Sequence, residues 1–200
     1  MLNNTIIPTA YFGPIEYYAI LSKYKCNIEN HEHFVKQSIR NRCEIYSSYG
    51  KLTLSIPKIR INSSKTMIKD IKISYAENWQ RTHWRAIKFS YNSSPYFQYY
   101  KEEIKNIIKK SEIYLLDFNL KAHKKILDIL KIETKIKLTH KYIKTGDFTD
   151  LRAYKFNKKF KEKYEQVFSH QHGFISNLSI LDLLFNLGPE SIEYLKRIEI

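Results

Sequence analysis

Apolar and polar positions along the chain alternate between strand-like and helix-like spacing. Apolar residues dominate positions 5–12, which predicts a buried strand, and Gly13-Pro14 then opens an amphipathic segment whose proline suits a first helical turn. Over 42–56, short alternating runs flank Ser47-Ser48-Tyr49-Gly50, which predicts a β-hairpin. The other predicted elements are strands at 26–30, 71–75 and 136–142, and helices at 15–24, from 78 to about 91, after a cap at Ser94, after a cap at Asp117, at 178–187 and from Ser191.

These predicted strands and helices follow one another without an internal repeat or a domain linker. The sequence therefore predicts one domain over residues 1–200 of the α/β class, with a mixed sheet flanked by helices, an inserted β-hairpin and an N-terminal β-loop-α unit. The turn at 11–14 would then lie at the carboxyl end of a strand, where open α/β sheets bind ligands. Tyr11 is accordingly a candidate ligand-binding residue.

The charge of the chain is strongly positive, with 34 Lys and Arg against 20 Asp and Glu and a net charge of +14. A hydrophobic content of 43% excludes an intrinsically disordered chain. Only seven of the cations are arginines, and a chain also rich in Ile, Asn and Tyr is typical of an AT-rich genome, which favours lysine whatever the function. Arginine is the sharper indicator, because its planar guanidinium binds carboxylates and phosphates bidentately. Four of the seven lie in two short stretches, at positions 40, 42, 81 and 85.

Cysteine usage and the N-terminal segment indicate a cytoplasmic protein without a metal site. Cys26 and Cys43 belong to no CxxC pair and are expected to be reduced thiols. The apolar N-terminus lacks a basic region and is interrupted by prolines, so neither a signal peptide nor a membrane span is expected. His31 and His33 have the spacing of a metal-binding pair, but no third ligand is evident and no metal is predicted.

The segment 33–42 is the first candidate for chemistry. Lys36, Arg40 and Arg42 place three cations within seven residues, together with the amide of Asn41. This combination suits a phosphate or carboxylate group. A solvated polar turn that leads into the hairpin explains the same residues equally well.

The segment 79–85 is the second candidate. On a helix, Trp79 and His83 share one edge, while Trp84 and Arg85 follow directly. Large rings beside an arginine could stack on a base or sugar, and His83 could act as a general acid or base. The alternative is that both tryptophans belong to the core and that His83 is a hydrogen-bonding residue within it.

The C-terminal third contributes further candidates. Asp150 is a possible general base, and Arg152 and Asn177 are possible ligand-binding residues. Ser179 and Asp182 have the spacing of a capping box, which would explain both without a ligand. Asp182 could instead orient a ligand-binding arginine.

Several segments have a sequence that is not generic: PTAYFGPIEYYAIL, KQSIRNRCEI with LSIP, NWQRTHWRAI, YNSSPYFQYY, DLR, YEQVF, GF and NLSILDLLFNLGPE. In this order, over nearly the whole chain, they resemble the WbqC family of bacterial proteins. The resemblance implies a cytoplasmic bacterial protein whose family is named from surface polysaccharide (O-antigen) gene clusters, and it carries over no catalytic residue or cofactor. The opening strand, turn and helix are also similar to the start of nucleotide-binding α/β enzymes with a His-x-Gly-His motif. Here that stretch is Pro14-Ile15-Glu16-Tyr17, so the motif's adenylyl transfer is not expected and only the architecture is shared.

Two classes of function follow from these observations. The first is a transferase of cell-envelope polysaccharide synthesis that binds a phosphorylated ligand, such as a nucleotide sugar or an acyl-CoA. Lys36, Arg40 and Arg42 would hold the phosphate, Asn41 would position the substrate, and His83 or Asp150 would act as base. The second is a binding protein, either a non-catalytic partner in a biosynthetic complex or a nucleic-acid-binding module suggested by the net charge.

Overall fold

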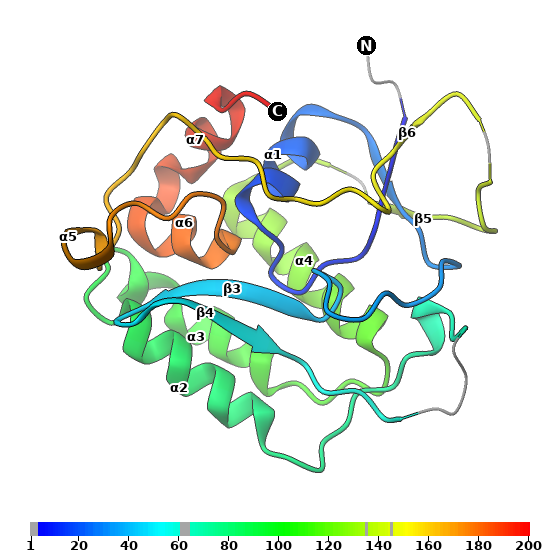
Figure 1. The fold of residues 1–200 in the computed structure, drawn as a ribbon, viewed down its shortest axis with the longest axis horizontal. Helices are drawn as coiled ribbons and strands as arrows, with labels where there is room; N and C mark the ends of the chain where they lie inside the picture. The colour runs from blue at the N-terminus through cyan, green and yellow to red at the C-terminus, as the bar shows by residue number, and fades with distance from the viewer. Residues whose placement is uncertain (1–3, 61–64, 135, 145) are drawn as a thin grey trace.

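The strands of the computed structural model, which describes residues 4–60, 65–134, 136–144 and 146–200, form two separate sheets within these ranges (Figure 1). The strands are β1 (Thr5–Ile7), β2 (Cys26–Ile28), β3 (Arg42–Ser47), β4 (Gly50–Ser55), β5 (Lys137–Leu138) and β6 (Thr149–Asp150). The helices are α1 (Ile15–Lys23), α2 (Trp79–Tyr91), α3 (Phe97–Lys109), α4 (Leu115–Leu130), α5 (Ser169–His172), α6 (Ile180–Leu187) and α7 (Ser191–Arg197), with 3-10 turns η1 (Ile68–Asp70) and η2 (Gly188–Glu190). The predicted α/β class, with its hairpin and β-loop-α unit, is confirmed.

The first sheet is parallel and has the strand order β5-β2-β1-β6. Thr5 of β1 is in register with Cys26 of β2 on one side and with Thr149 of β6 on the other. The chain leaves β1 through α1 to reach β2, whereas β6 returns to the opposite side of β1 much later. The strand order therefore reverses beside β1, and this is the position at which α/β sheets bind ligands.

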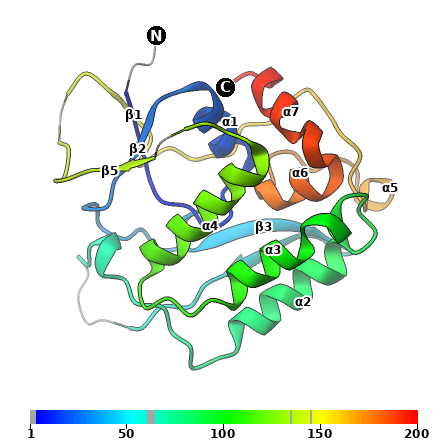
Figure 2. The same cartoon turned by 180° about the vertical axis from the view of Figure 1, so that it is seen from behind.

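The second sheet is the antiparallel hairpin of β3 and β4. Its register runs from Arg42 opposite Ser55 to Ser47 opposite Gly50, and Gly50 adopts a φ of +90° that a residue with a Cβ would rarely take. Strand β3 contacts α2 on one side and α6 on the other, and Figures 1 and 2 show the hairpin lying across the middle of the molecule between these helices. Parallel and antiparallel pairings are thus divided between two sheets.

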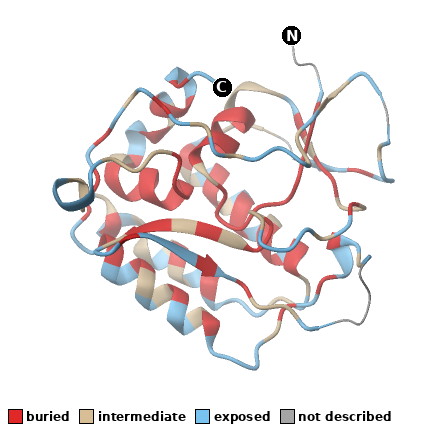
Figure 3. Ribbon diagram, viewed as in Figure 1, coloured by how far each residue is buried: buried red, intermediate tan, exposed pale blue. Residues whose placement is uncertain are grey.

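Burial follows the predicted helical spacing. Figure 3 shows that α6 and the inner face of α1 are almost entirely buried, while the outer faces of α2 and α3 are exposed. In α3, Phe97, Ile104 and Ile108 are buried, as their spacing predicts. Both cysteines are free and buried. Within the described ranges, no helix combines the length and apolarity needed to span a membrane.

Three predicted strands are shorter than the sequence pattern suggests. Strand β1 ends at Ile7, and the chain continues as buried, irregular structure because the Tyr11 amide donates to the Ile39 carbonyl at 2.8 Å and not to a neighbouring strand. The segment 71–75 makes only isolated bridges, one of them between Lys72 and Tyr114. The segment 136–142 contributes only β5, because Thr139 turns inward to donate to the buried Glu29 carboxylate at 2.6 Å.

Two predicted caps are wrong and one is confirmed. The residue at the N-cap of α4 is Tyr114 and not Asp117. Asp117 lies within the first turn, where its negative charge interacts favourably with the helix dipole. Tyr96 precedes α3, and the buried hydroxyl of Ser94 has no hydrogen-bond partner among the described residues. Ser179 caps α6, because its Oγ accepts the amide of Leu181 at 3.3 Å. The capping box with Asp182 is not formed, since the amide of Ser179 donates to the Glu44 carbonyl at 2.7 Å.

Candidate functional site

A groove of about 1120 Å³ lies at the carboxyl edge of the parallel sheet. Its walls come from Pro8 and Pro14 after β1, from 31–42 after β2, from 152–157 after β6 and from the first residues of the hairpin. These segments meet where the strand order reverses, which is the expected ligand position in an open α/β sheet. The fold thus brings segment 33–42 to the place where the topology predicts a site.

Arg40 is buried in the wall of the groove and binds other parts of the protein. It is 3% exposed, its Nε donates to Oε1 of Glu32 at 2.8 Å, and its Nη2 donates to Oε2 of the same carboxylate at 2.5 Å. Nη2 also donates to the carbonyl of Arg152 at 2.9 Å. Burial raises the pKa of Glu32, and the bidentate contact with Arg40 opposes that rise. Arg40 therefore joins the loops after β2 and β6, and its donors are occupied by the protein itself.

Arg152 forms a second ion network at the same edge. Its Nε and Nη2 donate to the two oxygens of Asp150 at 2.9 and 2.7 Å, and its Nη1 donates to the buried Glu29 at 3.2 Å. The guanidinium also lies over the ring of Tyr142, 4.5 Å from its centroid. Hydrogen bonding to Arg152 lowers the pKa of Asp150, which keeps this carboxylate ionised and a poor general base.

The groove carries an excess of positive charge after these pairs are removed. Seven lysine and arginine side chains line it, and three of them pair with carboxylates: Arg40 with Glu32, Arg152 with Asp150 and Glu29, and Lys51 with Glu44. Within the described ranges, the four without a carboxylate partner are Lys36, Arg42, Lys144 and Lys155. The Nε of Arg42 is buried and has no hydrogen-bond partner there. Unpaired cations on a concave surface favour an anionic ligand.

The same groove exposes large apolar side chains. Val35, Met67, Tyr142 and Tyr154 are between 38% and 50% exposed, and all four line it. Solvent-exposed apolar surface beside unpaired cations is typical of a site for a ligand with both an anionic and an apolar or aromatic part.

The N-terminus of α1, a common phosphate site in β-loop-α units, is closed by the protein itself. The amide of Ile15 donates to the Leu178 carbonyl at 2.9 Å, and the amide of Glu16 donates to Oδ1 of Asn177 at 2.9 Å. The Glu16 carboxylate is fully buried beside them and accepts from Tyr154 and Asn177. An anionic group in the groove must therefore be held by side chains, and this geometry agrees with the absence of the His-x-Gly-His motif.

Comparison with known proteins identifies the family. The sequence profile of the WbqC-like protein family matches residues 10–154 and 141–194. The chain belongs to the WbqC-like protein family. It is similar to the uncharacterised protein Rv1507c of Mycobacterium tuberculosis, with 25% identity over 197 residues that cover 82% of this chain and 84% of the relative. No solved structure is found to match it.

The second candidate segment of this WbqC-like protein does not reach the groove. His83 is 4% exposed, its Nδ1 lies 2.9 Å from the Tyr11 hydroxyl, and burial lowers its pKa to about 4. Trp79 packs edge-on against His83 and Phe118 in the core. These contacts agree with the core interpretation of Trp79 and His83, and Tyr11 is fully buried with them.

Of the remaining residues of that segment, Trp84 is half-buried and packs against the core, whereas Arg85 lies on the outer face of α2. Trp84 stacks on Phe97 with ring centroids 6.1 Å apart. Arg85 is exposed and lines a separate depression of about 360 Å³ with Asn78, Arg81 and Thr82. The structure therefore does not place 36–42 and 79–85 around one ligand.

Asn41 and Asp182 have structural contacts beneath the surface. The side-chain amide of Asn41 donates to the Ile56 carbonyl at 3.0 Å and so ties the two ends of the hairpin together. Asp182 is fully buried and accepts from Tyr91, Tyr164 and Gln166, with no arginine among these partners. Burial raises the pKa of Asp182 to about 6. Of the predicted site residues, Lys36, Arg40, Arg42, Arg152 and Asn177 line the groove.

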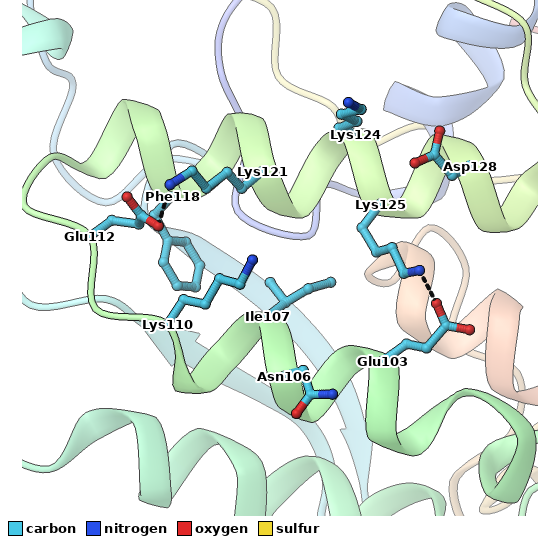
Figure 4. Close-up of a pocket in the computed structure, with 10 residues that line it drawn as sticks. All are labelled: Glu103, Asn106, Ile107, Lys110, Glu112, Phe118, Lys121, Lys124, Lys125 and Asp128. Atoms are coloured by element: carbon cyan, nitrogen blue, oxygen red, sulfur yellow. Dashed lines mark hydrogen bonds and ion pairs between the residues drawn. The ribbon is translucent and has the colours of Figure 1, made fainter.

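Another pocket, of about 450 Å³, lies between α3 and α4 (Figure 4). Lys121 pairs there with Glu112, and Lys125 pairs with Glu103 across the two helices. Four lysines and three acidic side chains line this pocket, whereas seven cations and two acidic side chains line the groove, so the groove offers more to an anionic ligand. Across the described ranges, no cluster of three or more His, Cys, Asp or Glu side chains is suited to a metal ion.

The sequence reasoning missed several groove residues. Tyr142, Lys144, Tyr154 and Lys155 come from 136–157, where the sequence indicated only Asp150 and Arg152 as candidates. The parallel arrangement of β5 and β6 beside β2 and β1 brings these residues to the carboxyl edge. His31 and His33, considered above as a metal pair, also line the groove.

Proposed function

We propose that the protein is a transferase of bacterial surface polysaccharide or cell-envelope biosynthesis, and that its groove binds a phosphorylated donor such as a nucleotide sugar or an acyl-CoA. The observation that carries the proposal is the groove itself, at the carboxyl edge of a parallel sheet. It has exposed apolar walls and four cations for which the described part of the chain supplies no carboxylate partner. Membership of the WbqC-like family, named from polysaccharide gene clusters, supports the biosynthetic setting.

Lys36 and Arg42 are the proposed phosphate-binding residues. Both line the groove, and neither pairs with a carboxylate in the described ranges. Arg42 is partly exposed to the groove and offers a planar guanidinium with several donors, which suits the oxygens of a phosphate. Arg40 and Arg152 hold the surrounding loops in place through their carboxylate partners.

We assign the general base to a histidine that lines the groove, in place of His83 or Asp150. His83 is buried outside the groove, and Asp150 is held ionised by Arg152. His31 and His33 line the groove, and an imidazole there is a base that an acceptor in the groove could reach. In the proposed reaction an acceptor hydroxyl or amine bonds to the donor group, the donor's bond to its phosphate or thiol leaving group breaks, and the acceptor proton passes to an imidazole.

Isothermal titration calorimetry with UDP-glucose and acetyl-CoA tests the binding proposal. The double variant Lys36→Ala, Arg42→Ala should weaken binding at least tenfold, because two charge-assisted contacts are removed. The matched control is Lys88→Ala, Lys109→Ala, which removes the same charge from exposed positions on α2 and α3. Equal weakening by both double variants would reduce the effect to net charge, and no binding by the wild type would refute the proposal.

A non-catalytic role in a biosynthetic complex is the second candidate. The observation that favours it is that neither His83 nor Asp150 is available as a base in the groove. Release of UDP or CoA in the presence of candidate acceptors distinguishes the two. If the wild type binds the donor but releases neither UDP nor CoA with any acceptor, the non-catalytic role is supported. If turnover occurs and is unchanged in His31→Ala and His33→Ala, the base proposed here is wrong.

A further inference from the structure

Tyr142 has the geometry of a preorganised aromatic surface. It follows β5, lines the groove and is 46% exposed. Arg152 lies over its ring at 4.5 Å from the centroid, so a cation occupies one face of that ring. A half-exposed tyrosine at the wall of a groove leaves its other face accessible to a ligand.

The arginine that covers Tyr142 is itself held firmly. Its guanidinium donates twice to Asp150 and once to the buried Glu29, and its side chain is 8% exposed. Glu29 in turn accepts from Thr139 and from the amide of Ile143, on both sides of the segment that leads to Tyr142. The ring is therefore positioned before any ligand arrives, which reduces the entropy lost on stacking.

Unpaired cations adjoin this ring in the sequence. Lys144 lies two residues after Tyr142, and both side chains line the groove. On the loop after β6, Lys155 directly follows Tyr154, whose hydroxyl donates to the buried Glu16 at 2.5 Å. Each of the two loops thus supplies one half-exposed tyrosine and one lysine without a carboxylate partner in the described ranges.

We infer that the groove binds a nucleoside diphosphate unit, whose base stacks on the open face of Tyr142 and whose phosphates lie among the unpaired cations. Arg152 acts as a positioning residue that holds the ring from behind. The inference rests on the proposed function, because it names the chemical class of the phosphorylated ligand. A nucleotide sugar and coenzyme A both carry this unit.

Calorimetric titrations with UDP, sodium pyrophosphate and uridine test the inference on the whole protein. Stacking on an aromatic side chain is worth about 5- to 140-fold in affinity, so UDP should bind tighter than pyrophosphate by about that factor. Tyr142→Leu, which keeps apolar bulk but removes the flat ring, should lower UDP affinity to the level of pyrophosphate. Tyr142→Phe should retain UDP binding, and Tyr49→Leu at the exposed tip of the hairpin is the matched control.

The outcomes separate this inference from the proposed function. If UDP and pyrophosphate bind the wild type equally, the stacking assignment is wrong and the phosphate site stands. The same conclusion follows if Tyr142→Leu binds UDP as tightly as the wild type, while the double variant Lys36→Ala, Arg42→Ala binds UDP more weakly. If no phosphorylated compound binds, both fail. Where UDP binding depends on Tyr142, parallel titrations with UDP-glucose and coenzyme A show which source of the diphosphate the groove prefers. Unchanged binding of pyrophosphate by Tyr142→Leu excludes misfolding as the cause of its lower affinity for UDP.

Discussion

The structure predicts that Arg40 stabilises the fold and does not contact the ligand, in contrast to Arg42 two residues later. Arg40 is 3% exposed and bidentate on the buried Glu32, whereas Arg42 is partly exposed to the groove and has no carboxylate partner in the described ranges. Substitution of the two arginines should therefore affect different properties. Arg40→Ala should destabilise the protein, and Arg42→Ala should mainly weaken ligand binding.

The magnitude follows from what Arg40→Ala leaves behind. Glu32 would remain buried without its partner, and removal of one member of a buried ion pair costs about 3–5 kcal/mol. Arg42→Ala removes no ion pair from the described ranges and should cost about 1 kcal/mol or less. Glu32→Gln combined with Arg40→Met removes both charges, so the double variant should be more stable than Arg40→Ala alone.

Urea unfolding followed by tryptophan fluorescence measures these differences. Burial raises the pKa of Glu32 above its unfolded value, and loss of Arg40 removes the contact that opposes this rise. Because the pKa of Glu32 is higher in the folded than in the unfolded protein, its contribution to stability is fully present below the unfolded pKa. That contribution is lost as the pH rises through the folded pKa. The destabilisation by Arg40→Ala should therefore be smaller at about pH 5 than at about pH 7.5. An Arg40→Ala variant of wild-type stability and reduced ligand affinity would refute the structural role.

Three further predictions concern the core. Ser179→Ala should lower the unfolding free energy by about 1–2 kcal/mol in urea titrations, because Ser179 caps α6 and donates to the Phe12 carbonyl at 2.7 Å. A variant as stable as the wild type would contradict this prediction. His123→Phe should stabilise the protein, since neither ring nitrogen of His123 has a partner among the described residues and the ring already stacks on Tyr18. Burial lowers the pKa of His123 to about 3, so the gain in stability should grow as the pH falls below about 6.5. Thermal unfolding across that pH range checks this prediction. Burial raises the pKa of Asp182 to about 6, so its contribution to stability should be lost as the pH rises from about 4 to 6. The unfolding free energy of the wild type should fall with pH in this range, and that of Asp182→Asn should not. Equal slopes of the unfolding free energy against pH would refute this prediction.

The elements with strong local signals could be predicted from the sequence. The hairpin around Ser48-Tyr49, the helical spacing of Phe97, Ile104 and Ile108, and the Ser179 cap depend on neighbouring residues, and the structure contains all of them. The parallel sheet was harder, because β5 and β6 have two residues each and are defined by partners more than 100 residues away. Sequence alternation at 136–142 therefore overstated the length of that strand.

The candidate site was only partly predictable for a related reason. Lys36 and Arg42 could be recognised, because arginine and lysine cluster there against the background of the chain. Arg40 could not be separated from Arg42, since its burial depends on Glu32 and on the distant Arg152. Tyr142 reaches the groove only through the pairing of short strands, and nothing in its local sequence distinguishes it from the many other tyrosines.

A crystal structure of the protein with UDP would test the central claim most directly. The account predicts that the diphosphate contacts Lys36 and Arg42 in the groove at the carboxyl edge of the parallel sheet, with the base on the open face of Tyr142. A diphosphate bound instead in the pocket between α3 and α4, or beside Arg81 and Arg85 on α2, would contradict it.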